Sequence, residues 1–265
     1  MFLQNLISHR IDNNTPVKVA LIGAGKFGSM FLSQVPTTPG LEVVIIADLI
    51  PDSAKKACKH VGWKDDLISN TEFVESGIKA ITKSEVEVVV EATGHPSAGI
   101  LHAREAFRYG KHIVMVNVEA DVLAGASLSK EAKSAGVVYS MAYGDQPALT
   151  AEIVDWARSS GFYVTAAGKG TKYLPEYHKS TPETVWNYYG LTEKDANEAG
   201  MNAKMFNSFL DGTKSSLEMA AIANACNLRV PSNGLLFPPC GMDDLAEVLN
   251  PVSYTHLRAH ETAYH

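Results

Sequence analysis

The stretch VKVALIGAGKFG, from Val17 to Gly28, decides the fold that we predict for this chain. It opens with a run that is apolar apart from one lysine, which is typical of a strand buried in a sheet. Three glycines follow at Gly23, Gly25 and Gly28 in the spacing G-x-G-x-x-G, and a helical pattern begins among them. The glycine spacing alone is a weak signal. A strand, a glycine turn and a helix in this order indicate a dinucleotide-binding unit.

The three glycines have distinct expected roles at a bound pyrophosphate. Gly23 permits the tight turn, Gly25 lets the backbone approach the phosphates, and Gly28 lets the helix pack closely on the sheet. The N-terminus of that helix favours the negative charge of the phosphates. Between the last two glycines lie Lys26 and Phe27, which we include among the candidate cofactor contacts.

Asp48 stands at the end of the next predicted strand, twenty residues after Gly28. A carboxylate at this point bonds the 2′-hydroxyl of the adenosine ribose, which favours NAD. Lys55 and Lys56 follow closely enough to neutralise a 2′-phosphate, so the sequence leaves NAD and NADP both open. A structural glycine turn and a solvated strand end are the alternatives, and the complete strand, turn, helix and acid context favours the cofactor.

Strands and helices alternate through the first half of the chain. We predict strands at 17–22, 41–48, 86–93, 111–118 and 137–142, and helices at 25–35, 53–62, 96–110 and 120–136. This alternation predicts right-handed crossovers and a parallel, doubly wound sheet, whose ligands bind outside the carboxyl ends of the strands. The candidate cofactor residues at two such ends are Thr93, Gly94, Asn117 and Glu119. For His95, a helix-capping and a catalytic role are both open.

The pattern of elements changes after residue 144. It predicts a helix over 146–161, a strand over 163–168, two short helices from Thr181 and Thr192, and a long helix over about 202–227. We therefore predict an α/β protein with a Rossmann-type, doubly wound NAD(P)-binding domain over 1–144. A smaller α+β catalytic domain follows over 145–251.

The last residues, 252–265, continue no pattern that precedes them. Their sequence, VSYTHLRAHETAYH, resembles the translated read-through of a sequencing adapter or vector. We treat this segment as a non-native tail and leave it out of the fold prediction. It follows that we expect the natural chain to continue beyond Pro251 and the catalytic domain to be incomplete.

Composition excludes several classes of protein. The chain has 265 residues and a net charge of −6, whereas a general nucleic-acid binder is basic. No apolar run reaches the roughly 18 residues of a membrane span, and the N-terminus lacks the pattern of a signal peptide. The three cysteines are widely spaced and odd in number, which suits a reducing cytoplasm. We expect a cytoplasmic homo-oligomer that binds a small-molecule substrate.

The segment Ala166 to Ser180, AAGKGTKYLPEYHKS, concentrates polar groups of the second half. It is not a Walker loop, which needs G-x-x-x-x-G-K-[ST] between a strand and a helix. We expect a loop at a strand end in which Lys169, Lys172 and Tyr173 bind an anionic, polyhydroxylated substrate. A solvated basic loop is the alternative.

The predicted long helix carries a polar stripe at spacings of three and four residues. Its members are Lys204, Asn207, Asp211, Lys214 and Glu218. Such a stripe is often a solvated face, but Gly212 costs roughly 1 kcal/mol in mid-helix, which indicates close approach by another group. We propose Lys214 and Asp211 as catalytic candidates, since a lysine near carboxylates can act as an acid or base.

Several motifs resemble known families. VKVALIGAGKFG, Glu91-Ala-Thr-Gly and Val116-Asn-Val-Glu-Ala resemble the cofactor domain of homoserine dehydrogenases, which usually have a lysine where this chain has Val118. The segments 143–148, 167–178, 205–214 and 237–241 instead resemble the deoxyxylulose-phosphate-reductoisomerase-like oxidoreductases, a related family. This resemblance implies an NAD(P)-dependent oxidoreductase, and members commonly carry a further C-terminal SAF-type domain.

Three functions remain open from the sequence. The first is reduction of a small, phosphorylated hydroxy-ketone or aldehyde by NADP- or NAD-bound hydride. The second is homoserine dehydrogenase, acting on aspartate semialdehyde, and the third is a non-catalytic nucleotide-binding fragment. An isomerising reductase would also use a divalent cation. The possible oxygen ligands follow no spacing rule, so we name no metal site.

Overall fold

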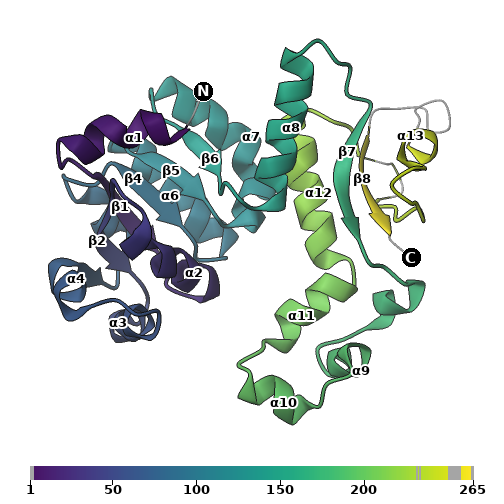
Figure 1. Cartoon of the computed structure of the whole chain (residues 1–265), viewed down its shortest axis with the longest axis horizontal. Coiled ribbons are helices and arrows are strands. Elements are labelled where there is room, and N and C mark those ends of the chain that lie inside the picture. Colours follow the sequence, from purple (N-terminus) through teal and green to yellow (C-terminus); the bar gives the residue numbers. More distant parts are fainter. Residues whose placement is uncertain (1–2, 231, 233, 250–257, 264–265) are drawn as a thin grey trace. The chain divides into compact units, whose positions relative to one another are not determined.

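The computed structural model describes residues 3–230, 232, 234–249 and 258–263. The chain divides into two compact units, Met1–Ala142 and Tyr143–His265. Figure 1 labels the elements of both units.

The first unit contains a six-stranded sheet. Its strands are β1 (Val17–Ile22), β2 (Leu41–Ala47), β3 (Glu72–Val74), β4 (Val88–Glu91), β5 (His112–Met115) and β6 (Tyr139–Met141). They lie in the order β3-β2-β1-β4-β5-β6, and every neighbouring pair is parallel. This is the strand order of the dinucleotide-binding doubly wound fold, so the predicted fold class is confirmed.

Helices cover both faces of this sheet. They are α1 (Leu3–Asp12), α2 (Lys26–Gln34), α3 (Pro51–His60), α4 (Asp65–Asn70), α5 (Gly77–Thr82), α6 (Pro96–Arg108) and α7 (Val118–Ser134). Alternate residues of β1 enter different cores: Ala20 and Ile22 pack with α5, α6 and α7, and Val19 and Leu21 pack with α2, α3 and α4. Burial on both faces explains why the strands are continuously apolar.

The sequence prediction missed four elements of the first unit. Helices α1, α4 and α5 and strand β3 all lie outside the predicted ranges. The strand β3 is three residues long and α4 and α5 are six each, too short for their hydrophobic period to stand out. A further difference concerns Asn117, which is not part of a strand but the N-cap of α7.

The second unit is mostly helical. It contains α8 (Gln146–Ser159), β7 (Ala166–Thr171), the 3-10 turn η2 (Pro175–Lys179), α9 (Val185–Tyr189), α10 (Glu193–Glu198), α11 (Ala203–Leu210), α12 (Thr213–Cys226), α13 (Leu245–Val248) and β8 (Arg258–Ala263). Strands β7 and β8 pair in parallel along their whole length. Strand β8 falls within the segment that we left out of the fold prediction, and the rest of that segment lies outside the described residues.

Two predictions for the second unit were wrong. The long helix over 202–227 is two helices, because Gly212 has φ = +88° and forms the N-cap of α12. A left-handed residue ends a helix rather than continuing it, and glycine adopts it without a side-chain penalty. The predicted strand over 163–168 begins later, so Lys169 lies within β7 and not in a loop after it.

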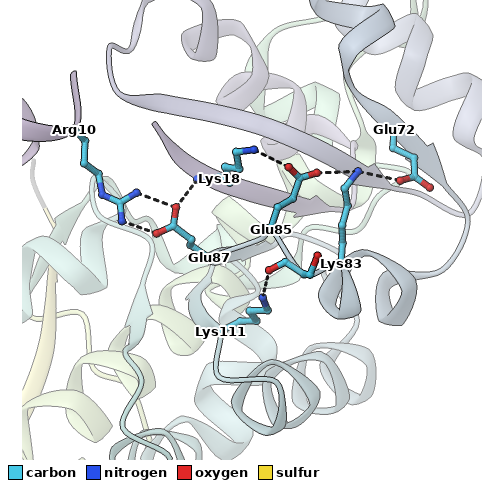
Figure 2. Close-up of polar contacts among 8 residues, drawn as sticks. Arg10, Lys18, Glu72, Lys83, Glu85, Glu87 and Lys111 are labelled. Atoms are coloured by element: carbon cyan, nitrogen blue, oxygen red, sulfur yellow. Dashed lines mark hydrogen bonds and ion pairs between the residues drawn. The ribbon is translucent and has the colours of Figure 1, made fainter. Parts of the chain in front are cut away.

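Ion pairs connect several elements at the end of the sheet where β1 begins, opposite the glycine turn, as Figure 2 shows. The guanidinium of Arg10 contacts both carboxylate oxygens of Glu87, at 2.8 and 2.5 Å. The ammonium of Lys18 lies 2.6 Å from Glu85, and Lys83 bridges Glu85 and Glu72 at 3.1 Å each. These contacts join α1, β1 and β3 to the turn that precedes β4.

The network generates a pH-dependent stability. The hydrogen bond from Arg10 lowers the pKa of Glu87 below its ordinary value of 4.5. A carboxylate whose pKa is lower in the folded state than in the unfolded state stabilises the fold at any pH above the unfolded-state pKa. That stability is lost as the pH falls through the folded-state pKa.

We expect Glu87→Gln to lower the melting temperature at pH 7 by a small amount, and the difference to shrink as the pH falls below 4.5. Thermal unfolding of both proteins across pH 3 to 7 checks this, and an equal difference at every pH contradicts it.

Candidate functional site

The glycine turn after β1 is packed as the sequence requires. Gly23 has φ = +95°, and a Cβ there would lie 2.7 Å from the carbonyl oxygen of Ala92. A Cβ on Gly28 would overlap the carbonyl oxygen of Gly23, while a Cβ on Gly25 would meet nothing within 4 Å. The turn and the helix are therefore pressed together at the outer two glycines, and open space is left at the middle one.

Asp48 holds this turn in place. Its Oδ2 accepts a hydrogen bond from the backbone N–H of Ala24 at 2.9 Å, and its Oδ1 accepts one from Ile50 at 3.0 Å. Each carboxylate oxygen keeps a further lone pair for a ligand. Asp48 can thus fix the turn and still accept a bond from a ribose hydroxyl.

A cavity of about 660 Å³ opens at this edge of the sheet. Its lining includes four predicted cofactor residues, Gly23, Gly25, Asp48 and Thr93. Of the others, Lys26, Phe27, Gly94 and Glu119 are exposed, Gly28 and Asn117 are buried, and none of them lines the cavity. Lys55 and Lys56 are exposed on α3 and do not line it either. An open glycine backbone, a helix N-terminus and a free carboxylate lone pair fit a dinucleotide.

Asn117 is a positioning residue and does not face the cavity. Its side chain is buried, and its Oδ1 caps α7 by accepting from Ala120 at 3.1 Å. Its Nδ2 donates to the backbone oxygen of His95 at 3.0 Å and lies 3.3 Å from Thr93 Oγ1. The side chain of His95 caps α6 by accepting from Ala98. Of the two roles left open for His95, capping is therefore the one seen.

Alanine substitution should have different effects at Gly28 and at Gly25. We expect Gly28→Ala to lower the melting temperature strongly, because its Cβ overlaps backbone that cannot move away. We expect Gly25→Ala to keep the melting temperature, since its φ of −69° suits alanine, but to weaken NADH binding about tenfold or more. Thermal unfolding and fluorescence titration with NADH check both, and normal NADH binding by Gly25→Ala contradicts the assignment.

In the second unit, two lysines converge on one buried carboxylate. Glu218 of α12 is 2% exposed. The ammonium of Lys169 from β7 contacts its Oε2, and the ammonium of Lys214, one helical turn before it, lies 3.3 Å from its Oε1. The side chains of the two lysines are themselves 15% and 23% exposed. A strand and a helix thus bring three charged groups into one largely buried cluster.

One neighbouring side chain orients this cluster. Gln146, the first residue of α8, accepts a hydrogen bond from Lys169 at 3.2 Å through its Oε1. At the start of α12, the turn at Gly212 faces the rings of His178 and Phe237, which lie within 3.5 Å of the position of a Cβ. The close approach that we inferred from Gly212 is thus present, although the residue is a helix cap.

Tyr173 belongs to this aromatic group. Its ring stacks on Phe237 with the centroids 4.0 Å apart, and its hydroxyl lies 3.1 Å from His178 Nδ1. Lys172, by contrast, is exposed, and no contact of its side chain with the lysine–glutamate cluster occurs among the described residues. The structure therefore gathers Lys169, Tyr173 and Lys214 around the start of α12 and leaves Lys172 outside.

Asp211 has a structural role that its position in the predicted stripe did not reveal. Its Oδ1 accepts from the backbone N–H of Thr213 at 2.8 Å, and its Oδ2 accepts from Asn207 Nδ2 at 2.9 Å. The side chain therefore stabilises the break between α11 and α12. The stripe is not one solvated face, since Asn207 and Glu218 are both buried.

A metal site does not emerge from the described side chains. Within the described ranges, no three His, Cys, Asp or Glu side chains lie close enough together to hold a metal ion. The possible oxygen ligands that the sequence offers are Asp145 at the N-cap of α8, Glu176 in η2, Asp211 at the C-cap of α11 and Glu218 in α12. The divalent cation stays a prediction.

The sequence did not indicate the roles of two residues, Gln146 beside Lys169 and His102 in the cofactor cavity. Gln146 lies in the motif 143–148, but its position there predicted no role beyond the start of a helix. His102 lines the cofactor cavity from the second turn of α6, where one histidine in a helix gives no signal. The register of Glu218 relative to Lys214 was visible as an i,i+4 pair, but its contact with Lys169 was not.

Family models match both halves of the chain. Residues 17–143 match the oxidoreductase family with an NAD-binding Rossmann fold, GFO/IDH/MocA. Residues 144–263 match the catalytic domain of Oxidoreductase DRL. The nicotinamide dinucleotide cofactor predicted from Gly23 to Gly28 is thereby confirmed as a class. None of the curated proteins matches the chain.

Solved structures share the fold at low sequence identity. A homoserine dehydrogenase from Thiobacillus denitrificans is 16% identical with a TM-score of 0.54, over 81% of this chain and 50% of that chain. A myo-inositol dehydrogenase from Lactobacillus casei, in complex with NAD(H) and myo-inositol, is 16% identical with a TM-score of 0.47, over 64% of this chain and 50% of that chain. A 3-ketoreductase from Actinomadura kijaniata, in complex with TDP-benzene and NADP, is 20% identical with a TM-score of 0.42, over 60% of this chain and 50% of that chain. The chain spans about half the length of these structures.

Among the residues that the structure describes, no helix is long and apolar enough to cross a membrane.

Proposed function

We propose that the chain is the cofactor and substrate part of an NAD(P)-dependent oxidoreductase that reduces the carbonyl of a small, anionic hydroxy-ketone or aldehyde. The observation that carries this proposal is the convergence of Lys169 and Lys214 on the buried carboxylate of Glu218. The family of the first unit supports the redox chemistry, and the polar cluster of the second supports the substrate class.

The cluster suits an anionic substrate for electrostatic reasons. Lys214 has three N–H donors, of which the contact with Glu218 Oε1 uses one. In a largely buried site a charge-assisted hydrogen bond to a carboxylate or phosphate is shorter and stronger than a neutral one. Glu218 holds both ammonium groups in fixed positions, so little side-chain freedom is lost when the substrate binds.

The reaction needs a hydride and a proton. The dihydronicotinamide supplies the hydride to the carbonyl carbon, and negative charge develops on the carbonyl oxygen. We assign Lys214 as the donor of the proton to that oxygen, and Lys169, held between Gln146 and Glu218, as the anchor of the substrate anion. The hydroxyl of Tyr173, beside His178, is the second candidate for hydrogen bonding to a substrate oxygen.

Two substrates have the required chemistry. Deoxyxylulose 5-phosphate carries a hydroxy-ketone and a phosphate, and it is the one that the motifs of the second half favour. Aspartate semialdehyde carries an aldehyde and a carboxylate. The lack of a lysine after Asn117 counts against the second.

A substrate screen tests the reaction. We expect one of these compounds, or a related sugar acid or ketone, to cause NADH or NADPH oxidation followed at 340 nm. The screen uses the 265-residue chain with and without Mg²⁺. If the chain oxidises neither cofactor with any of these compounds, both named reactions are wrong.

Substitution at Lys214 tests its chemical role. We expect Lys214→Met to lower kcat by roughly a hundredfold or more, which is the usual contribution of a general acid, and to leave the dissociation constant of NADH unchanged. Lys172→Met is the matched control, because Lys172 is exposed and outside the cluster. Equal losses of turnover and NADH binding, or equal effects of the two substitutions, would remove Lys214 from the reaction.

A further inference from the structure

Two residues outside the prediction contribute to the polar lining of the cofactor cavity. Beside Asp48, the lining includes Glu75, which follows β3, and His102 from α6. Ala47 pairs with Val74 in the sheet, so the next residues of the two strands, Asp48 and Glu75, emerge side by side. Two neighbouring carboxylates can only accept hydrogen bonds when ionised.

His102 joins this lining because Glu91 holds its ring. Glu91 is completely buried at the end of β4, and its Oε1 lies 3.1 Å from His102 Nδ1. The same oxygen is 2.6 Å from Thr93 Oγ1. That hydroxyl itself lies 3.3 Å from the N–H of His95 and 3.3 Å from Asn117 Nδ2, so its own hydrogen points to Glu91. Glu91 Oε1 is thus the acceptor in both contacts.

The tautomer of His102 follows from this contact. Since Glu91 accepts, Nδ1 of His102 carries the proton, and the Nε2 of the neutral ring is an acceptor. Nε2 lies against Gly77, where a Cβ would come within 2.5 Å of it. A glycine at this position, at the start of α5, leaves the space that the ring nitrogen occupies.

His95 also lines the cavity, and its Nε2 has the opposite hydrogen-bonding role to that of His102. The Nδ1 of His95 accepts from the backbone N–H of Ala98 at 3.4 Å, so the neutral ring of His95 carries its proton on Nε2. His95 therefore offers a donor, which suits phosphate oxygens, while His102 offers an acceptor. Two histidines that line one cavity can be distinguished by experiment.

We propose that Glu75 and the Glu91-held His102 extend Asp48 into an acceptor wall that receives the ribose hydroxyls of adenosine and selects NAD(H) over NADP(H). The adenosine ribose presents two hydroxyls as donors. A 2′-phosphate replaces one donor by acceptor oxygens and adds negative charge beside two carboxylates. Within the described part of the chain, the cavity lining contains no lysine or arginine to neutralise it. The proposal rests on the NAD-binding domain and is independent of the substrate.

Equilibrium binding to the 265-residue chain gives the first test. We expect NADH to bind at least about tenfold more tightly than NADPH in fluorescence titrations at low salt. His102→Asn keeps a donor for Glu91 and withdraws the acceptor from the cavity, so it should weaken NADH about tenfold and NADPH much less. The matched control is His95→Asn, which keeps the helix cap and should leave the NADH to NADPH ratio unchanged. Equal or tighter binding of NADPH by the wild-type chain, or an unchanged NADH to NADPH ratio in His102→Asn, overturns the proposal.

Nuclear magnetic resonance of the unsubstituted protein gives a second test, which reads the tautomer of His102 directly. The ¹⁵N shifts of the histidine rings distinguish the two tautomers, and His102 is assigned by comparison with His102→Asn. We expect His102 to be protonated on Nδ1 and its Nε2 shift to move when NAD⁺ is added. A ring protonated on Nε2, or an Nε2 shift that NAD⁺ does not change, overturns the proposal. Because neither test uses a substrate, their failure is distinguishable from failure of the proposed reaction.

Discussion

Close backbone packing at Gly23 and Gly28 is the constraint on which the cofactor domain depends. Gly23 turns the chain at positive φ directly against Ala92, and Gly28 brings α2 onto the carbonyl of Gly23. No side chain fits at either point. The first residues of α2 therefore lie at the carboxyl end of β1, next to β4. The strand order reverses between these two strands. That junction is where a doubly wound sheet binds its ligand.

The polar groups around this turn are hydrogen-bonded to one another. Asp48 accepts from the amide of Ala24, and Glu91 accepts from Thr93 and His102. A buried carboxylate is stable only when hydrogen bonds compensate its lost hydration. These bonds hold the side chains in position before a ligand binds, which lowers the entropy cost of binding.

In the second unit, Glu218 is the buried carboxylate that two lysines contact. Lys169 reaches it from β7, and Lys214 lies one turn before it on α12. Removing one partner of such a cluster leaves a buried charge uncompensated, so the three residues are held as a set. The break at Gly212 matters here, because it sets the direction of α12 and with it the register of Lys214 and Glu218 towards β7.

Sequence patterns predicted best where the structure is regular. Five strands of the sheet and the helices α2, α3, α6, α7 and α8 lie close to their predicted positions, since the apolar segments that contain them are long enough to display a period. Very short elements such as β3 and α5 have too few residues for this. The helix break at Gly212 was misjudged because a glycine inside a periodic stretch can be a costly helical residue or a left-handed cap, and the period does not distinguish them.

By itself, the sequence determined the doubly wound sheet, the glycine turn and the acidic residue that follows it, because these depend on local periodicity and on the steric freedom of glycine. Only the tertiary structure decided which polar side chains meet. It brought Lys169 to Glu218 and placed His102 beside Glu91. The physical reason is that these contacts join residues from different elements, and their geometry depends on how whole helices and strands pack, which no local pattern records.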